Sequence, residues 1–412
     1  MNTQTFADLQ SQTTNQDTPN KTPGNKNADV TTKCRTSLLC ATIVLVLSAN
    51  TKVTAQQYAL SDLGVLPGKT ESMPSALNNA GQVAGTCSAG PSLQAAFRFN
   101  SNNGGKNPLE DIGRSQTGAI SRGFGINGVG EIVGDSSFSF VTRTPITHAA
   151  LFGNGLVRDL GFLKSGGNYS RANDINAAQQ VVGFSSPTRD GENSRAFFWT
   201  ASTGMIDIGT LGGPYAQANA INDAGFITGS SEIATGVLRT THAFLVQPFS
   251  ITGAKPVPMR DLGTLGGNSS VGTSLNTSNH VVGYSDLNTV DQRVHAFFFD
   301  GVGMKDLGSL GAKTSESDQS FALGINVADE IVGYTFVPGG TTPQGSRPAP
   351  EQVAFLYENG RMTDLNTLIG SEASKYQLLA ATAINDKAQI VAVALNHTTK
   401  TLRSVLLTPT GK

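Results

Sequence analysis

Residues 195–209 read RAFFWTASTGMIDIG: an alternating apolar strand, a polar turn, and a second short strand ending in an Asp-aliphatic-Gly triplet. The triplet recurs along the chain, and the residue two positions before its Asp is apolar in every copy. One triplet alone is weak evidence, but seven with the same flanks, 45 to 58 residues apart, indicate an internal repeat. The Asp residues are Asp62, Asp111, Asp159, Asp207, Asp261, Asp306 and, in a weaker DLN form, Asp364.

Each triplet is followed by an aliphatic-Asn pair and a valine-rich run. The residue three positions after the Asn is usually Gly, Asn or Asp, the types that tolerate positive φ, so we expect a three-residue hairpin. Gln179 and Ala388 fit that geometry less well. The Asn residues are Asn78, Asn127, Asn176, Asn222, Asn276, Asn326 and Asn385. Seven positions later stand Gly85, Gly134, Gly183, Gly229, Gly283, Gly333 and, breaking the series, Ala392. We expect these glycines to permit bends.

A third block alternates along a strand, as in HAFFF. Its third and fifth residues are nearly all apolar, and a period of two places them on one face, packed against a neighbouring layer. The seven copies begin at Ala95, His148, Arg195, His242, His295, Val353 and Arg403.

Four short strands in 45 to 50 residues make the size of one β-propeller blade. The repeats begin at Tyr58 with a lone DLG strand and end at Arg403 with a lone HAF-type strand. Pairing these two strands would complete a mixed blade and remove exposed edges. The sequence therefore predicts an all-β seven-bladed propeller, one repeat domain of seven four-stranded units over residues 56–412. An open β-solenoid is the alternative.

The HAF strand, the DLGxLGG turn and the INxxGxVVG hairpin resemble the HAF-repeat family of predicted extracellular bacterial proteins. The resemblance covers Tyr58 to about Pro409, with degenerate copies around Asp111 and Asp364. It implies an exported repeat protein and supplies no catalytic residues.

The charge of the chain is nearly balanced. It has 29 basic and 30 acidic residues, a net charge of −1, so no basic field indicates a nucleic-acid partner.

The N-terminal stretch predicts the location of the protein. Residues 1–35 are polar and predicted to be disordered. Residues 36–55 are predicted to be a signal peptide, because Lys33 and Arg35 precede an apolar run and Val53-Thr54-Ala55 offers a cleavage site before Gln56. We expect an exported, extracellular or periplasmic monomer without a stable membrane span; an uncleaved anchor is the alternative.

No residue is assigned a catalytic, cofactor-binding or metal-binding role. Cys87 is the one cysteine after the leader, and we expect a half-buried strand residue. The strand-initial His148, His242 and His295 belong to different units, too widely spread for a tetrahedral metal site. His280 and His397 have no evident partner in the sequence. The Asp of each triplet is expected to accept backbone hydrogen bonds in its turn, with calcium binding as the alternative.

The function best suited to this pattern is a binding or scaffold module for a glycan, a peptide or a surface partner, because no nucleophile elbow, P-loop, HExxH or CxxC occurs. The alternatives are a carbohydrate-active hydrolase or lyase with acidic residues converging on a central channel, and a structural surface component. The loop carboxylates to consider are Asp190, Glu192, Asp286 and Asp291. Two insertions, at 247–258 and 337–352, are candidate recognition loops.

Overall fold

The computed structural model describes residues 57–411 except 91–92, 101–108, 116–119, 142–143, 154, 165–166, 189–190, 192, 235–239, 248–257, 291–292, 312, 314–315 and 340–348. The described residues form seven four-stranded antiparallel sheets, which we number as blades 1 to 7. Blade 1 holds β2 (Glu71–Leu77), β3 (Val83–Ser88), β4 (Gln94–Phe99) and β5 (Leu109–Asp111). Blade 2 holds β6 (Ser121–Ile126), β7 (Ile132–Val141), β8 (Thr144–Gly153) and β9 (Leu156–Gly161). Blade 3 holds β10 (Tyr169–Ile175), β11 (Val181–Ser186), β12 (Arg195–Thr200) and β13 (Gly204–Asp207).

The remaining blades repeat this order. Blade 4 holds β14 (Gly212–Ile221), β15 (Ile227–Ile233), β16 (Thr241–Val246) and β17 (Arg260–Asp261). Blade 5 holds β18 (Ser270–Leu275), β19 (Val281–Asp286), β20 (Val294–Phe299) and β21 (Met304–Asp306). Blade 6 holds β22 (Ser320–Ile325), β23 (Ile331–Val337), β24 (Glu351–Glu358) and β25 (Arg361–Asp364). Blade 7 holds β26 (Tyr376–Ile384), β27 (Ile390–Asn396), β28 (Leu402–Thr410) and β1 (Gln57–Asp62).

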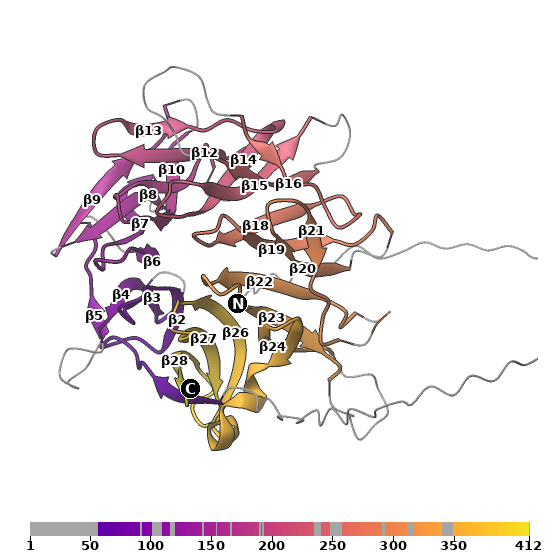
Figure 1. The fold of residues 1–412 in the computed structure, drawn as a ribbon. Helices are drawn as coiled ribbons and strands as arrows, with labels where there is room; N and C mark the ends of the chain where they lie inside the picture. Colours follow the sequence, from indigo (N-terminus) through magenta and orange to yellow (C-terminus); the bar gives the residue numbers. More distant parts are fainter. Residues whose placement is uncertain are drawn as a thin grey trace, which may run out of the picture. The chain divides into compact units, whose positions relative to one another are not determined.

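The blades stand side by side in a ring, so the predicted seven-bladed propeller is confirmed (Figure 1). The first strand of each blade lies nearest the middle, where it contacts the first strands of both neighbours, and the DLG strand lies outermost. Two short 3-10 turns, η1 (Leu365–Leu368) and η2 (Gly370–Ser374), precede the last blade. No helix among the described residues is long and apolar enough to cross a membrane.

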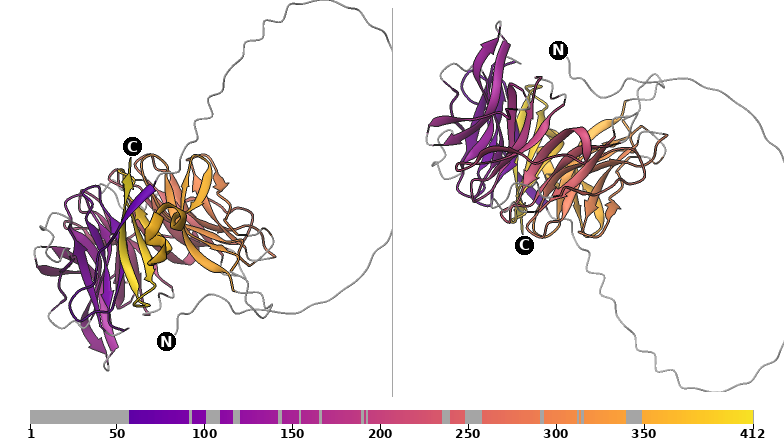
Figure 2. Two further views of the ribbon diagram at one scale, coloured as in Figure 1. Left: turned by 90° about the horizontal axis from the view of Figure 1, so that it is seen from below. Right: turned by 90° about the horizontal axis from the view of Figure 1, so that it is seen from above.

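The ring closes through the two ends of the repeat region, as the split repeat predicts. β1 pairs antiparallel with β28, with Tyr58 opposite Pro409 and Asp62 opposite Val405. Figure 2 shows the indigo β1 beside the yellow C-terminal strands. Blade 7 therefore takes three strands from the C-terminal end of the repeats and one from the N-terminal end. This pairing removes the edge that an open stack would leave on β28.

The predicted Asn hairpin is present in all seven blades. In blade 1 the Gly81 amide donates to the Asn78 carbonyl at 3.0 Å, and Gly81 has a φ of +76°. Gln179 and Ala388, the two less suitable residues, adopt the same left-handed conformation, each with a φ of +56°. Tertiary packing imposes the turn even where the residue type disfavours it.

The glycine that follows each Asn by seven positions has another role than the expected bend. A Cβ atom added to one of these glycines would lie too close to a carbonyl oxygen of the adjoining first strand. The distance would be 1.8 to 1.9 Å at Gly134, Gly183 and Gly283. A β-bulge shifts the register beside each of them, for example between Ala172 and Asp174. The glycines therefore permit close approach of two strands rather than a turn.

The HAF strand is buried more completely than one-face packing predicts. In β12, Phe197 and Trp199 pack with blade 2 residues, while Phe198 packs with residues of blade 4. All three are at most 4% exposed. Burying one such side chain contributes roughly 1.5–3 kcal/mol. A blade lies between two others, so both faces of its central strands are core.

Some of the sequence predictions concern residues outside the part of the chain that the structure describes. The polar leader (1–35) and signal peptide (36–55) fall there, as do most of the insertions at 247–258 and 337–352.

Candidate ligand-binding site

The recurring polar residues hold the propeller together. The first oxygen of each DLG aspartate accepts the backbone N–H two residues on, as in Gly161 N to Asp159 Oδ1 at 2.7 Å, which confirms the expected turn role. The same aspartates also bind the histidines that begin HAF strands. The pairs are His148–Asp159, His242–Asp261 and His295–Asp306.

The other two histidines have partners that the sequence did not reveal. His280 Nδ1 lies 2.8 Å from Asp329 Oδ1 of the next blade, and His397 Nδ1 lies 3.1 Å from the Ser374 carbonyl. Within the described residues, no group of three or more His, Cys, Asp or Glu side chains could hold a metal ion.

The hairpin asparagines form a circle that sequence reasoning missed. Each Asn donates from Nδ2 to the backbone carbonyl of the corresponding Asn in the next blade. The bonds run Asn78 to Asn127, Asn127 to Asn176, Asn176 to Asn222, Asn222 to Asn276, Asn276 to Asn326, Asn326 to Asn385 and Asn385 to Asn78. All seven side chains are buried. These asparagines are structural, and they mark one face of the ring.

Cys87 is fully buried rather than half-buried. Its sulfur accepts a weak hydrogen bond from the Leu66 amide at 3.5 Å, and burial raises the pKa of the thiol to about 11. A neutral, enclosed thiol is a poor nucleophile.

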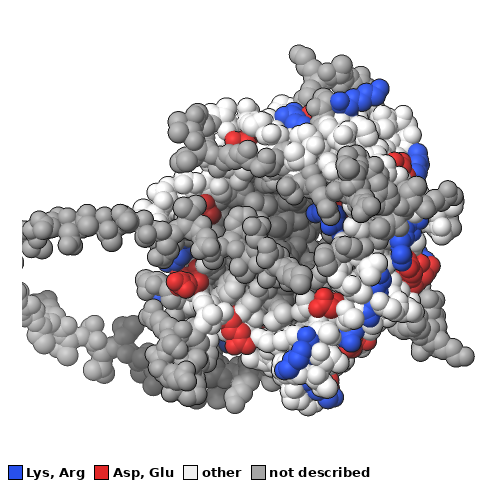
Figure 3. All heavy atoms as spheres, turned by 180° about the vertical axis from the view of Figure 1, so that it is seen from behind, with Lys and Arg blue, Asp and Glu red and all other residues white. Residues whose placement is uncertain are grey.

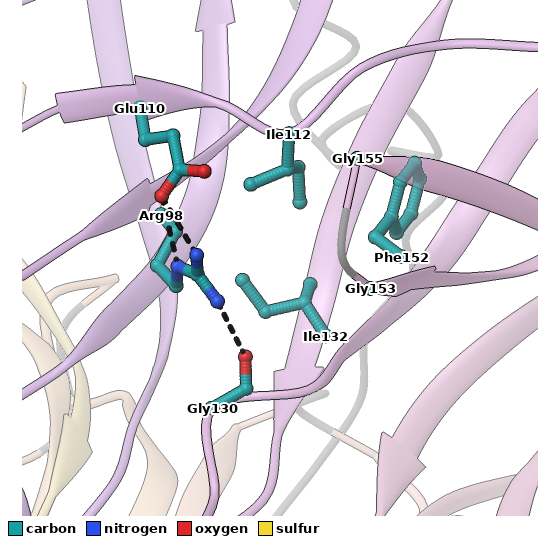
Figure 4. Close-up of a pocket in the computed structure, with 8 residues that line it drawn as sticks. All are labelled: Arg98, Glu110, Ile112, Gly130, Ile132, Phe152, Gly153 and Gly155. Carbon is teal, nitrogen blue, oxygen red and sulfur yellow. Dashed lines mark hydrogen bonds and ion pairs between the residues drawn. The ribbon is translucent and has the colours of Figure 1, made fainter.

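A small pocket between blades 1 and 2 is also structural (Figure 4). Arg98 bridges its wall, donating to Glu110 at 2.8 Å and to the Gly130 carbonyl at 3.2 Å. The enclosed space is about 10 Å³, enough for about one water molecule. Arg98 therefore ties two blades together and encloses no ligand-sized space.

A more promising pocket, of about 110 Å³, lies where blades 2 and 3 meet. Asp135 of β7, which is 1% exposed, accepts hydrogen bonds from Arg122 of β6 and from Arg171 of β10. The Arg171 guanidinium lies over the rings of Phe124 and Phe184, at 4.7 and 5.5 Å from their centroids. The pocket thus contains two cations held by one anion and by aromatic faces.

Further aromatic side chains lie at the same end of blades 4, 5 and 6. Tyr284 of β19 lies 5.0 Å from Phe321 of β22, and Phe321 stacks on Tyr334 of β23 at 4.7 Å. Tyr215 of β14 hydrogen-bonds Ser230, and it is near enough to Tyr284 of the next blade to add to the effect of burial in raising the pKa of Tyr284. Burial raises the pKa of Tyr334 to about 12, so its hydroxyl stays protonated and can donate.

We call this set the rim arc: Arg122, Asp135, Arg171, Phe184, Tyr215, Tyr284, Phe321 and Tyr334. Asp135 is buried and the other seven are half-buried. In blade 2, Arg122 is near the start of the inner strand whereas Asn127 follows its end, so the arc lies away from the asparagine circle. Repeat positions that hold the fold keep one residue type, but the position after each second-strand glycine changes from Asp135 to Phe184 to Tyr284. That variation within the chain is the signal by which the arc could have been found.

One face of the ring carries charged side chains of both signs. On the face in Figure 3, basic and acidic side chains of the described residues are interspersed, and neither sign forms a continuous patch.

The structure does not bring the four predicted loop carboxylates together in a site within the residues that it describes. Asp190, Glu192 and Asp291 lie outside the described residues, and Asp286 accepts the Ser269 amide at the end of β19. A carboxylate that the structure does place among inner strands is Asp174. It accepts the Ile175 and Ile221 amides at 2.9 Å each, and burial raises its pKa to about 7. Its two oxygens are therefore engaged by backbone donors.

Comparison with protein families corrects one expectation. The model of a family described as "Protein of unknown function (DUF3466)" matches residues 214–406. Nothing in the comparison indicates a HAF-repeat family, so the resemblance drawn from the HAF, DLG and IN motifs was wrong. The structure explains the error. These motifs are the buried strand, turn aspartate and hairpin asparagine that this blade requires, so they identify the blade rather than the family.

Two solved structures are similar to the chain. The β-propeller domain of the Trilobed protease from Pyrococcus furiosus is 8% identical with a TM-score of 0.48, over 84% of this chain and 95% of that one. The acylaminoacyl peptidase of Pyrococcus horikoshii is 10% identical with a TM-score of 0.46, over 83% of this chain. The match covers 52% of the peptidase, so the chain spans about half its length. Among curated proteins no match is found. Both structural likenesses are remote, so the propeller assignment rests on the strand order of the seven sheets.

Proposed function

We propose that this protein is an exported binding module that recognises a polymeric extracellular ligand, a glycan, through the rim arc. The observation that carries the proposal is the arc itself. Arginine and aromatic side chains of five consecutive blades are half-buried at the same end of the blades, at positions the fold leaves free to vary.

The arc is chemically suited to a glycan. Tyrosine offers an apolar ring and a polar hydroxyl, which match the apolar faces and the hydroxyls of a sugar. The Phe321–Tyr334 stack places two rings nearly parallel, with an interplanar angle of 14°. Because these rings already contact one another, little side-chain entropy is lost when a ligand packs on them.

Export is part of the same proposal. It is supported by the basic residues Lys33 and Arg35, the following apolar run and the small residues before Gln56. N-terminal sequencing of protein recovered from the periplasm or the culture medium should begin near Gln56. Recovery of the intact chain from cytosol alone would contradict export.

Binding is tested with residues 56–412 on a glycan array and a matched peptide library, each probed for binding and for turnover. Tyr334→Ala and Phe321→Ala should weaken binding to the glycan hit. Phe226→Ala is the control, because Phe226 is half-buried and closes the Asn222 hairpin, at the end of blade 4 that carries the asparagine circle. A hit confined to peptides, turnover of a polysaccharide, or equal losses in all three variants would contradict the proposal.

A further inference from the structure

The pocket between blades 2 and 3 has an unbalanced charge. Arg122 Nε donates to Asp135 Oδ1 at 2.8 Å and its Nη2 donates to Oδ2, while Arg171 Nε donates to Oδ2 at 3.4 Å. Two guanidinium groups therefore share one carboxylate, and the cluster carries a net charge of +1. A partly buried charge without a counter-ion is costly, so an anion would complete this cluster.

The donors for such an anion are present. Within the described part of the chain, no protein acceptor bonds Nη1 of Arg122 or either terminal nitrogen of Arg171. The side chains of Arg122 and Arg171 are 25% and 33% exposed, so these nitrogens are partly open to solvent. The rings of Phe124 and Phe184 lie against the Arg171 guanidinium and restrict its position.

The rest of the lining suits a sugar ring. Tyr169 and Thr147 bring hydroxyl groups to the pocket, and Phe184 brings an apolar face. A volume of about 110 Å³ admits a carboxylate and part of one sugar ring but not a whole oligosaccharide. Further sugars would extend along the arc toward Tyr284 and Phe321.

We propose that Arg171 and Arg122 form a subsite for the carboxylate of an acidic sugar within the glycan ligand. This inference rests on the proposed function and specifies its substrate class. The planar guanidinium fork matches a planar carboxylate through two parallel hydrogen bonds. Asp135 holds Arg122 in place and, with the aromatic rings, sets the orientation of Arg171.

The test is calorimetric titration of residues 56–412 with an oligomer of galacturonic acid and with its methyl ester, in which each carboxylate is neutral. The free acid should bind at least about tenfold more tightly than the ester. Arg171→Gln should weaken binding of the free acid about tenfold and binding of the ester much less, so that the preference for the acid is lost, while Asp135 keeps Arg122 as its partner. Arg171→Lys should restore part of it.

Two controls separate the subsite from net charge and from folding. Arg260→Gln removes the same charge at the outer strand β17, where Arg260 lies over Phe299, and should leave both affinities unchanged. Thermal unfolding of each variant, with and without ligand, checks that binding is lost without loss of fold.

Each of the other possible results contradicts a specific part of the proposal. Equal affinity for acid and ester, or full preference in Arg171→Gln, overturns the carboxylate subsite while Tyr334→Ala still tests the arc. A polyglutamate peptide or inorganic sulfate that competes as well as the free acid overturns the sugar assignment. Failure of both oligomers and of every glycan on the array overturns the proposed function as well.

Discussion

Asn385 in blade 7 donates a hydrogen bond from Nδ2 to the backbone carbonyl of Asn78 in blade 1, at 3.1 Å. This bond crosses the junction between the last and first inner strands and completes the circle of seven asparagines. Within its own hairpin, Asn385 also accepts the backbone amides of Lys387 and Gln389 through Oδ1. One side chain thus fixes a turn and joins the two ends of the ring.

Asn385→Ala should therefore destabilise the protein by roughly 2 kcal/mol or more, because it removes three hydrogen bonds between a buried side chain and backbone groups. The matched control is Asn79→Ala. Asn79 bonds Asp386 across the same junction but is exposed, and water can replace its partner. The control should lose less than about 1 kcal/mol. Urea unfolding of both variants measures the difference; equal losses would contradict a special role for the buried circle.

Gly183→Ala tests the close approach of the first and second strands. A Cβ at this position would lie 1.9 Å from the Arg171 carbonyl oxygen, so the two strands must separate. We expect a loss of roughly 1–3 kcal/mol, the usual cost of overpacking a core. Gly153→Ala in β8 is the control, since nothing lies within 4 Å of its added Cβ. Thermal melts should show a lower Tm for Gly183→Ala only.

His295 makes the stability of the blade 5–6 contact depend on pH. Its Nδ1 lies 2.8 Å from Asp306 and its Nε2 3.0 Å from Asp318. Burial opposes the charged imidazolium, but hydrogen bonds and charge from both carboxylates outweigh it and raise the pKa of His295 above its ordinary 6.5. In turn, His295 helps to lower the pKa values of Asp306 and Asp318 below 3.8, against their own burial.

The signs of these shifts define a pH window. A raised histidine pKa stabilises the fold fully below pH 6.5, and the effect is lost as pH rises through the higher folded value. The lowered aspartate pKa values stabilise it above pH 3.8, and that effect is lost as pH falls through the folded values. The Tm difference between the wild type and His295→Gln should therefore be largest between these limits and shrink on both sides. A difference that grows from pH 6 to pH 9 would contradict this assignment.

Ring closure can be tested by its register. Ala59 of β1 lies opposite Thr408 of β28, and both are exposed. A double variant Ala59→Cys and Thr408→Cys should form an intramolecular disulfide under mild oxidation, because directly opposed residues bring their Cβ atoms close enough. Ala59→Cys with Thr410→Cys moves the second thiol two residues along and should cross-link much more slowly. Similar rates, or only intermolecular dimers, would contradict this register.

The sequence was sufficient to predict the features that recur in every repeat and the hydrogen bonds between residues close in sequence. The turn Asp159 and the hairpin Asn78 bond amides within four residues, so a recurring short motif was enough to assign them. The bond from Asn78 to Asn127 joins residues 49 positions apart, and no spacing within one unit reveals it. The ring closure was predictable because every other unit contains both the HAF strand and the DLG strand. Only the first DLG strand (β1) and the last HAF-type strand (β28) lack a partner in sequence.

The rim arc could not be predicted in the same way. Arg171 acquires its role from Asp135 and Phe124, which belong to the preceding blade. The stack of Phe321 on Tyr334 joins two strands whose partnership depends on the bulged register of blade 6. Asp135, Phe184, Tyr284 and Tyr334 follow second-strand glycines in the sequence, but only the ring shows that they lie at the same end of their blades.

The central claim is that ligand occupies the rim arc. It is tested most directly by hydroxyl-radical footprinting of residues 56–412 with and without the best glycan from the array. Tyr284, Phe321 and Tyr334 report from the arc, whereas the half-buried Phe226 of the Asn222 hairpin and Tyr376 of blade 7 report from elsewhere. Saturating ligand should slow oxidation of the three arc residues several-fold and leave Phe226 and Tyr376 unchanged. Unchanged oxidation of the arc, with protection of either outside residue, would contradict the claim.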